Sequence, residues 1–274
     1  MKTGIQPPSL SDISKKANLS ENEVSLFLEL IKRSMQPSAK RISVFEDGVT
    51  RYFQVERRGL GILNTRYGKF WEYSFAIDDQ WQTYSVIVKA GLDESSLTPA
   101  FADKTQLILR TDSGCETGQL FGDLTCECGE QLHLALKTIE EAGEGMVISI
   151  PRQDGRGLGL TFKLATLWIQ DVLGLHTVET AALLAPGGVI DVRTYSGVIC
   201  ILKFFEISES CMINLATNNP KKAEVFSENG YTVTNYTPII VAPNEHTELH
   251  LRAKQDHLGH MNLVTEKGGA HENN

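Results

Sequence analysis

The sequence predicts an α/β protein with a β-rich first half and a short helical segment at its N-terminus. Strand-like and helix-like segments alternate after residue 105, which is typical of an α/β catalytic domain. Between residues 56 and 111 strand patterns predominate. We therefore expect a helical extension over residues 1–55, a catalytic domain over residues 56–264 and a polar tail over residues 265–274.

The N-terminal segment has the pattern of two short helices, over residues 9–17 and 21–35. Ser20 is placed to cap the second helix, its apolar residues recur at helical spacing, and Pro37 ends it. Two helices with a three-residue connection resemble a helix–turn–helix, but no basic cluster accompanies them. The pattern favours a packing or dimerising appendage over a DNA-binding one.

The remaining elements follow from local patterns. The clearest strands of the β-rich half are residues 84–89 and 105–110. A helix is predicted over residues 129–142, ended by Gly143, because apolar residues recur on one face. After it, the sequence predicts strands over 146–150 and 212–216 and helices over 158–173, 192–205 and 220–228.

Composition bounds the location and the partners. Hydrophobic residues make up 41% and charged residues 22% of the 274 residues, both ordinary for a globular protein. No apolar run reaches the roughly 18 residues of a membrane helix, and the N-terminus lacks the apolar core of a secretory signal. We expect a cytoplasmic protein without a membrane partner. The net charge of −8 argues against broad nucleic-acid binding, although basic residues in one pocket can still bind a small anion.

Three of the five cysteines lie close together in the sequence. Cys115, Cys126 and Cys128 form the pattern C-x10-C-x-C. Thiolates are strong ligands for zinc, and three protein ligands leave the fourth position that a catalytic zinc site needs. A structural zinc site closed by a distant residue, or plain buried cysteines, remain open as alternatives.

Several motifs, all in one order, carry a family resemblance. They are residues 110–118 (RTDSGCETG), 126–132 (CECGEQL), 152–160 (RQDGRGLGL), 191–195 (DVRTY) and 217–222 (TNNPKK), with a closing stretch over 244–260. Together they resemble the GTP cyclohydrolase II family over roughly residues 60–262. The resemblance implies a homodimeric enzyme that requires Zn²⁺ and Mg²⁺. It would convert GTP into a diaminopyrimidinone ribosylamino phosphate, formate and pyrophosphate, as a first step towards riboflavin.

The resemblance also implies roles for single residues. In the family, the arginine that matches Arg193 is proposed to attack the α-phosphate, with the aspartate that matches Asp191 as proton acceptor. Because arginine stays protonated, stabilising phosphoryl charge is the easier role. Asp191 can also serve as a plain helix cap. The metal ligands would be Cys115, Cys126 and Cys128. The substrate-binding positions would be Arg110, Thr111, Asp112, Ser113, Gly114, Gln131, Asp154, Gly155, Arg156, Thr177, Thr217 and Lys222.

Three positions depart from the family pattern. Leu167 stands where the family usually has a tyrosine, Gly114 where it has a glutamate, and Asp112 where it has a histidine. Leucine has no hydroxyl to exchange a proton, so the reaction would stop at a formamidopyrimidine nucleotide, or another base would be opened, unless a hydroxyl such as that of Thr166 compensates. A regulatory protein that only binds a nucleotide is the non-enzymatic alternative.

Overall fold

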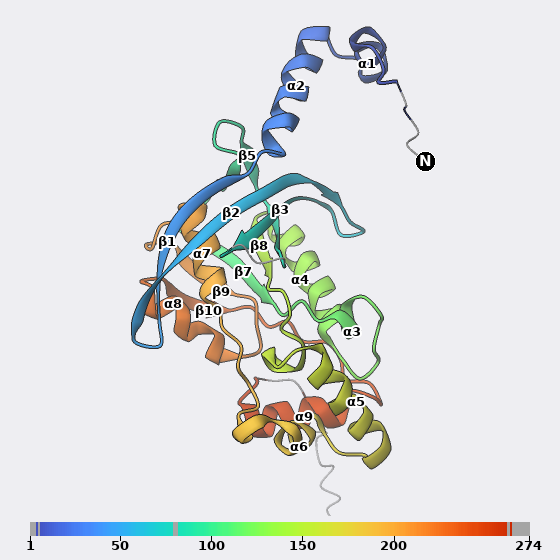
Figure 1. The fold of residues 1–274 in the computed structure, drawn as a ribbon, viewed down its shortest axis with the longest axis vertical. Helices are drawn as coiled ribbons and strands as arrows, with labels where there is room; N and C mark the ends of the chain where they lie inside the picture. The colour runs from blue at the N-terminus through green and yellow to red at the C-terminus, as the bar shows by residue number, and fades with distance from the viewer. Residues whose placement is uncertain (1–3, 5, 79–81, 262–263, 265–274) are drawn as a thin grey trace, which may run out of the picture.

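A computed structural model describes residues 4, 6–78, 82–261 and 264, and its centre is one curled eight-stranded sheet (Figure 1). The strand order is β1-β2-β3-β4-β8-β7-β9-β10. Neighbours from β1 to β8 pair antiparallel, and those from β8 to β10 pair parallel. The strands are β1 (Ser38–Glu46), β2 (Val49–Asn64), β3 (Lys69–Ile77), β4 (Tyr84–Lys89), β7 (Gln106–Asp112), β8 (Gly145–Ser149), β9 (Met212–Leu215) and β10 (Thr232–Tyr236).

Helices cover both faces of this sheet. Alternate side chains of β8 enter different cores: Met146 and Ile148 pack in the larger one, and Val147 packs in the smaller one. Helices α7 (Ser196–Phe204) and α8 (Glu224–Glu228) cover the face with the larger core. Helix α4 (Cys128–Ala142) covers the other face through Ala135, Leu136 and Ile139. The α/β class expected from the sequence is thereby confirmed.

A second group of helices lies beyond one end of the sheet. Helices α5 (Leu160–Leu173), α6 (Thr177–Leu184) and α9 (Glu248–Leu258) lie together at the bottom of Figure 1, with α6 in contact with both of the others. Short elements connect the layers, namely β5 (Gly91–Asp93), β6 (Thr98–Ala100), α3 (Glu116–Gln119), η1 (Asp154–Gly157), η2 (Pro186–Gly188) and η3 (Pro220–Ala223).

The N-terminal helices project away from the sheet (Figure 1). They are α1 (Leu10–Ala17) and α2 (Glu21–Ser34), and Ser20 and Glu23 form a capping box at the start of α2. The expected helical segment over 1–55 requires correction, because described residues 38–55 form β1 and the start of β2. In β1 the apolar residues Ile42 and Val44 alternate with more exposed positions, which is a strand period.

Two further expectations are refined. The helix predicted over 192–205 begins only at Ser196, so Asp191 and Arg193 lie in a loop and not at a helix start. The polar tail expected over 265–274 lies outside the described residues. Within the described ranges, no helix has both the length and the apolar character needed to cross a membrane.

Candidate active site

The candidate site lies at the carboxyl ends of the parallel strands. Arg110 and Asp112 end β7, Ser149 ends β8, and Thr217 follows β9. Parallel strands place their carboxyl ends at one edge of the sheet, where α/β proteins commonly bind ligands. The loops after these strands carry most of the motif residues, so the topology brings them into one pocket.

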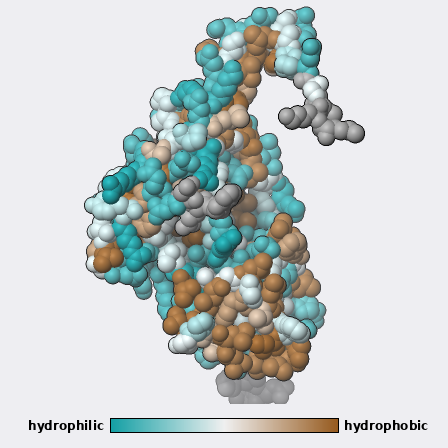
Figure 2. All heavy atoms as spheres, viewed as in Figure 1, coloured by the Kyte–Doolittle hydropathy of each residue, from teal (hydrophilic) through white to brown (hydrophobic). Residues whose placement is uncertain are grey.

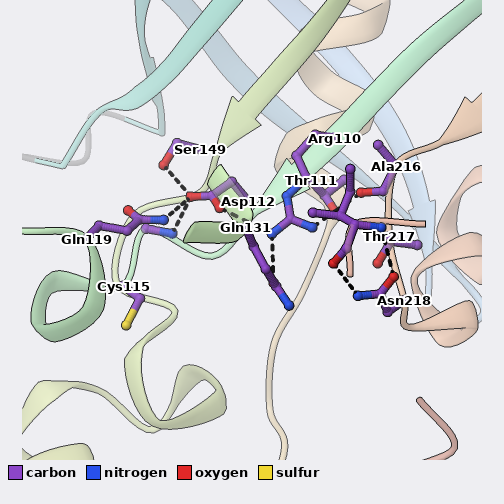
Figure 3. A network of polar contacts seen from close by, with 12 residues as sticks. Arg110, Thr111, Asp112, Cys115, Gln119, Gln131, Ser149, Ala216, Thr217 and Asn218 are labelled. Atoms are coloured by element: carbon purple, nitrogen blue, oxygen red, sulfur yellow. Dashed lines mark hydrogen bonds and ion pairs between the residues drawn. The ribbon is translucent and has the colours of Figure 1, made fainter. Parts of the chain in front are cut away.

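Asp112 is the centre of a buried network (Figure 3). Its side chain is 1% exposed, and its Oδ2 accepts hydrogen bonds from the backbone N–H of Gly114 at 3.1 Å, Gln119 Nε2 at 2.7 Å and Ser149 Oγ at 3.3 Å. Its Oδ1 lies 3.5 Å from Arg110 Nη2. This carboxylate therefore connects the end of β7 to the loop that carries Cys115, to α3 and to β8.

Two buried cations lie next to this network. The Arg110 guanidinium donates to the carbonyl of Ala216 at 3.3 Å and to Gln131 Oε1 at 3.1 Å. Lys222 Nζ donates to the carbonyl of Thr111 at 2.8 Å and lies 5.5 Å from the centre of the Tyr195 ring. Burial, together with the charge of Arg110, holds the pKa of Lys222 well below its ordinary value. A bound anion would relieve this unfavourable environment.

The three motif cysteines converge as their spacing predicted. The Sγ atoms of Cys115, Cys126 and Cys128 all lie within 4.8 Å of one another, and those of Cys115 and Cys126 are 3.6 Å apart. Among the described residues, they are the one set of three or more His, Cys, Asp or Glu side chains whose ligand atoms converge in this way. Sulfur ligands at about 2.3 Å from a tetrahedral zinc fit these separations. A Cβ on Gly118 would lie 2.7 Å from Cys126 Sγ, so this glycine leaves the room that the thiols occupy.

Without a bound metal ion, the charges and hydrogen bonds around the thiols favour a single thiolate. Hydrogen bonds from the thiols of Cys126 and Cys128, with the charge of Lys163, hold the pKa of Cys115 well below its ordinary value despite burial. Lys163 Nζ lies 2.8 Å from Cys115 Sγ and 3.7 Å from Cys126 Sγ. The thiolate of Cys115 in turn raises the pKa of Cys126 and of Cys128. Full ionisation of the three therefore requires a further positive charge, which a divalent cation provides.

The loop over 152–160 contributes a second arginine. Arg156 donates from Nη1 to the carbonyl of Thr177 at 3.3 Å and from Nη2 to its hydroxyl at 3.1 Å. Gly155 and Arg156 both have left-handed backbones, with φ of 56° and 58°, an uncommon conformation for an arginine. The carbonyl of Arg156 accepts the N–H of Val192 at 3.0 Å, which links this loop to the one that carries Asp191 and Arg193. Asp154 accepts the N–H of Glu116 at 3.1 Å.

Asp191 and Arg193 form an ion pair, and its arginine lines the pocket. Arg193 Nε donates to Asp191 Oδ1 at 2.9 Å, and Nη2 contacts Oδ2. Burial opposes the charge of both groups, but each partner outweighs it: the pKa of Arg193 is raised and that of Asp191 is lowered. Both groups are thus held in their charged forms, an arrangement suited to stabilising charge.

Most residues expected at the site line one pocket, and three do not. Thr111 is fully buried and contributes its carbonyl to Lys222. Gly114 donates to Asp112, and Asp191 lines a neighbouring hollow that shares Arg193 with the pocket. The expected residues that line the pocket are Arg110, Asp112, Ser113, Cys115, Cys126, Cys128, Gln131, Asp154, Gly155, Arg156, Thr177, Arg193, Thr217 and Lys222.

Comparison with known proteins agrees with this geometry. The family model described as GTP cyclohydrolase II matches residues 36–238. The chain belongs to the GTP cyclohydrolase II family. It is 36% identical over 199 residues to "GTP cyclohydrolase-2" of Picrophilus torridus, covering 73% of this chain and 95% of that protein. It is 32% identical over 221 residues to "GTP cyclohydrolase-2" of Streptomyces coelicolor, covering 81% and 93%.

A longer relative also matches. The chain is 34% identical over 198 residues to "Riboflavin biosynthesis protein RibBA" of Phocaeicola vulgatus, covering 72% of this chain but 45% of that protein. Members of the GTP cyclohydrolase II family are hydrolases, and the chain is thus a member of an enzyme family.

Two of the three departures from the family pattern, Asp112 and Leu167, line the pocket, and Gly114 donates to Asp112. Leu167 and Thr166 both line it, on the face of α5 that also carries Lys163. The hydroxyl of Thr166 donates to the carbonyl of Lys163 at 2.7 Å, so its proton is engaged while its oxygen can still accept a hydrogen bond. The expected compensation by Thr166 would therefore have to act through the oxygen.

Sequence reasoning missed other pocket residues. Lys163 lies on α5, seven positions after Arg156. Its closeness in the sequence to this motif arginine was the one feature that could have indicated a place in the pocket. His250, Lys254 and His260 lie in the closing stretch over 244–260, for which the resemblance gave no role at the site; they come from α9 and the turn after it and also line the pocket. Lys254 pairs with Glu127, between two of the cysteines, across 127 positions of sequence. No local pattern indicates such a contact.

Proposed function

We propose that this chain is a zinc-dependent GTP cyclohydrolase II that converts GTP into a diaminopyrimidinone ribosylamino phosphate, formate and pyrophosphate. The observation that carries this proposal is the convergence, in one pocket, of three thiols with Arg110, Arg156, Arg193 and Lys222. A cationic pocket beside a thiol cluster suits a nucleoside triphosphate whose base faces a metal. The names of the relatives support a place in riboflavin synthesis.

The four cations come from different elements around the pocket. Lys222 and Arg110 lie beside the strand ends, while Arg156 and Arg193 lie beside the loops over 152–160 and 191–195. Each buried cation loses solvation that a phosphate oxygen would replace. Magnesium bound to the triphosphate would neutralise the remaining phosphate charge.

Cys115, Cys126 and Cys128 would hold the zinc ion. Zinc bound there would supply Lewis acidity and lower the pKa of a water molecule that attacks the base. Gln131 lies on the first turn of α4, beside the cysteines, and its amide oxygen accepts from Arg110. That contact leaves its amide N–H groups to orient a base, and Asp112 fixes Arg110 in turn.

Asp191 and Arg193 would interact electrostatically with the phosphate groups of the substrate. The raised pKa of Arg193 disfavours loss of its proton to Asp191, so nucleophilic attack by this arginine is energetically costly. A guanidinium held by a carboxylate is pre-organised to stabilise charge that develops on a phosphoryl group. We assign Arg193 this role and Asp191 the role of orienting it.

Leu167 supports a second candidate product. It lines the pocket where the family usually has a tyrosine, and it can neither donate nor accept a proton. An enzyme that opens the ring and stops at a formamidopyrimidine nucleotide is therefore the alternative, as is a paralogue that opens another base.

A homodimer is also proposed, on the basis of the exposed apolar surface. Figure 2 shows apolar side chains gathered over the lower part of the molecule, where α5, α6 and α9 lie. On α5, Leu164, Trp168 and Val172 are exposed at i, i+4 and i+8 spacing and thus share one face. Apolar faces of this kind are commonly covered by another protein, here a second copy of the chain.

One assay separates the candidates. Protein loaded with Zn²⁺ and Mg²⁺ is incubated with GTP while formate, pyrophosphate and the ultraviolet spectrum are followed together, with chelator-treated protein as control. Formate and pyrophosphate with a diaminopyrimidinone spectrum are the expected result. Ring opening without formate would identify the truncated reaction. No change with GTP would refute the substrate assignment, and the same assay is then run with the other nucleotides.

A further inference from the structure

Helix α9 forms one wall of the pocket, although it lies outside the segment that matches the family model. That match ends at residue 238, and α9 begins at Glu248. His250, Lys254 and Leu258 line the pocket at i, i+4 and i+8 spacing, so one face of α9 is turned toward it. Arg252 and Asp256 lie on the exposed side of the same helix. The helix falls within the closing stretch over residues 244–260 that shares the family pattern, but no role at the site was expected for its residues.

A short ion pair joins α9 to the turn that carries Cys126 and Cys128. Lys254 Nζ lies 2.6 Å from Oε1 of Glu127, and their side chains are 19% and 7% exposed. Glu127 stands between Cys126 and Cys128 and is the N-cap residue of α4. Its Oε2 has no hydrogen-bond partner within the described residues. One lysine thus provides the ion-pair partner of a carboxylate placed between two thiols.

The buried negative charge of Glu127 is compensated by Lys254. Glu127 is a buried carboxylate in the turn between Cys126 and Cys128, and a buried carboxylate without a cationic partner is energetically unfavourable. Removing one partner of a buried pair leaves an uncompensated charge, which is far more costly than removing both. Lys254 therefore matters for the thiols even though it contacts none of them by hydrogen bond.

The segment after α9 is also held by a backbone hydrogen bond to another pocket loop. The N–H of Met261 donates to the carbonyl of Asn218 at 2.8 Å, in the loop that follows β9. The N–H of His260 donates to the carbonyl of Lys254 at 3.3 Å. The segment after α9 is therefore attached to the loop between Thr217 and Lys222, while Lys254 attaches the helix to the cysteine turn.

We propose that Lys254 is a positioning residue for the metal site: through Glu127 it holds the turn with Cys126 and Cys128 and compensates the carboxylate between them, so that the three thiols retain zinc. This inference rests on the proposed zinc site but on no particular substrate. It concerns the metal and is independent of which nucleotide the pocket takes.

The test measures the rate at which zinc leaves the protein. Purified full-length variants loaded with one equivalent of Zn²⁺ are mixed with excess chromophoric chelator, and release is followed by absorbance. Lys254→Met is expected to release zinc about 10–100-fold faster than wild type, the range typical of groups that support a metal ligand. Lys254→Arg, which keeps the charge, is expected to restore slow release to within about 3-fold of wild type.

A double variant tests the electrostatic part. Glu127→Gln combined with Lys254→Met contains no uncompensated charge, so it is expected to release zinc more slowly than Lys254→Met alone. Arg252→Met is the matched control, because Arg252 pairs with Glu248 on the exposed side of the same helix. The visible spectrum of the Co²⁺-loaded protein is expected to change in Lys254→Met and to be unchanged in Arg252→Met.

The outcomes separate this inference from the proposed function. Zinc retained equally by wild type and Lys254→Met would overturn the inference alone. Release accelerated equally in Lys254→Met and Arg252→Met would also overturn it, since any weakening of α9 would then suffice. A wild-type protein that retains no zinc would overturn the metal site itself and this inference with it.

Discussion

Replacement of Asp112 by asparagine is expected to destabilise the metal-free protein by about 3 kcal/mol. Asp112 is almost fully buried, accepts three hydrogen bonds on one oxygen, and lies 3.5 Å from Arg110 through the other. Asparagine keeps the shape but removes the charge. Its N–H groups would then face donors of Arg110, Gly114, Gln119 or Ser149 in any orientation of the amide.

The magnitude follows from the distances. At 3.5 Å and an effective dielectric constant of about 20, the attraction between Asp112 and Arg110 is about 5 kcal/mol. Each of the three hydrogen bonds weakens by about 1 kcal/mol when its acceptor loses charge. Asparagine also avoids several kcal/mol of carboxylate desolvation, which offsets part of the loss. About 3 kcal/mol remains.

The assay is urea unfolding of chelator-treated protein, followed by fluorescence, so that metal binding does not contribute. Asp171→Asn is the control, since Asp171 is an exposed aspartate on α5, and such a surface change is expected to stay within about 0.5 kcal/mol. A loss below about 1 kcal/mol in Asp112→Asn, or an equal loss in Asp171→Asn, would refute the assignment of Asp112 as the centre of a buried charged network.

Three further predictions concern the metal, pH and assembly. Cys126→Ser is expected to lower bound zinc, measured by atomic absorption, to less than about a tenth of wild type, because it removes one of three thiolate ligands; a full equivalent of zinc would contradict the ligand assignment. Burial and the charges of Lys254 and Arg193 lower the pKa of His260 to about 4, so the folded state resists its protonation and stability is lost as pH falls from 6.5 towards 4, by up to about 3 kcal/mol. Urea midpoints measured across this range are expected to fall less in His260→Gln than in wild type, and parallel curves would exclude this histidine as the cause. Trp168→Asp is expected to shift the sedimentation of a dimer to that of a monomer, because it places a charge on the exposed apolar face of α5, and an unchanged dimer would exclude that face.

Local patterns predicted the elements whose signals are strong and self-contained. The strand over 84–89 and the capped helix beginning at Glu21 occur as expected, because a short run of β-branched residues and a capping serine act within a few positions. The hairpin of β1 and β2 was missed since its exposed side carries charged residues such as Arg41 and Arg51, which dilute the strand period. Pairing across the sheet, and not propensity, determines these strands.

The candidate site was predictable where motifs are compact and not where contacts are distant. The cysteine spacing predicted the convergence of the three thiols because the two loops that carry them flank one short helix, α3. The family resemblance predicted that the arginines and Lys222 bind substrate, but not how they are arranged in space. The strand ends and the loops after them bring these residues into one pocket. The pairing of Lys254 with Glu127 spans 127 positions and needs the fold to exist first.

The arrangement of charge in the pocket is expected to destabilise the fold when neither metal nor nucleotide is bound. Lys222 is buried and feels the charge of Arg110, and Asp112 lies 3.5 Å from Arg110 and partly offsets the charge at Lys222. On the opposite side, the thiols and Glu127 concentrate negative charge, which Lys163 and Lys254 partly offset. A bound anion would reduce the repulsion between the buried cations, and a divalent cation would reduce that among the thiols and Glu127. Binding of each ligand is therefore expected to stabilise the fold. The network of Arg110, Asp112 and the Cys115 loop couples the two regions. Zinc and a nucleoside triphosphate added together are therefore expected to raise the unfolding temperature by more than the sum of their separate effects.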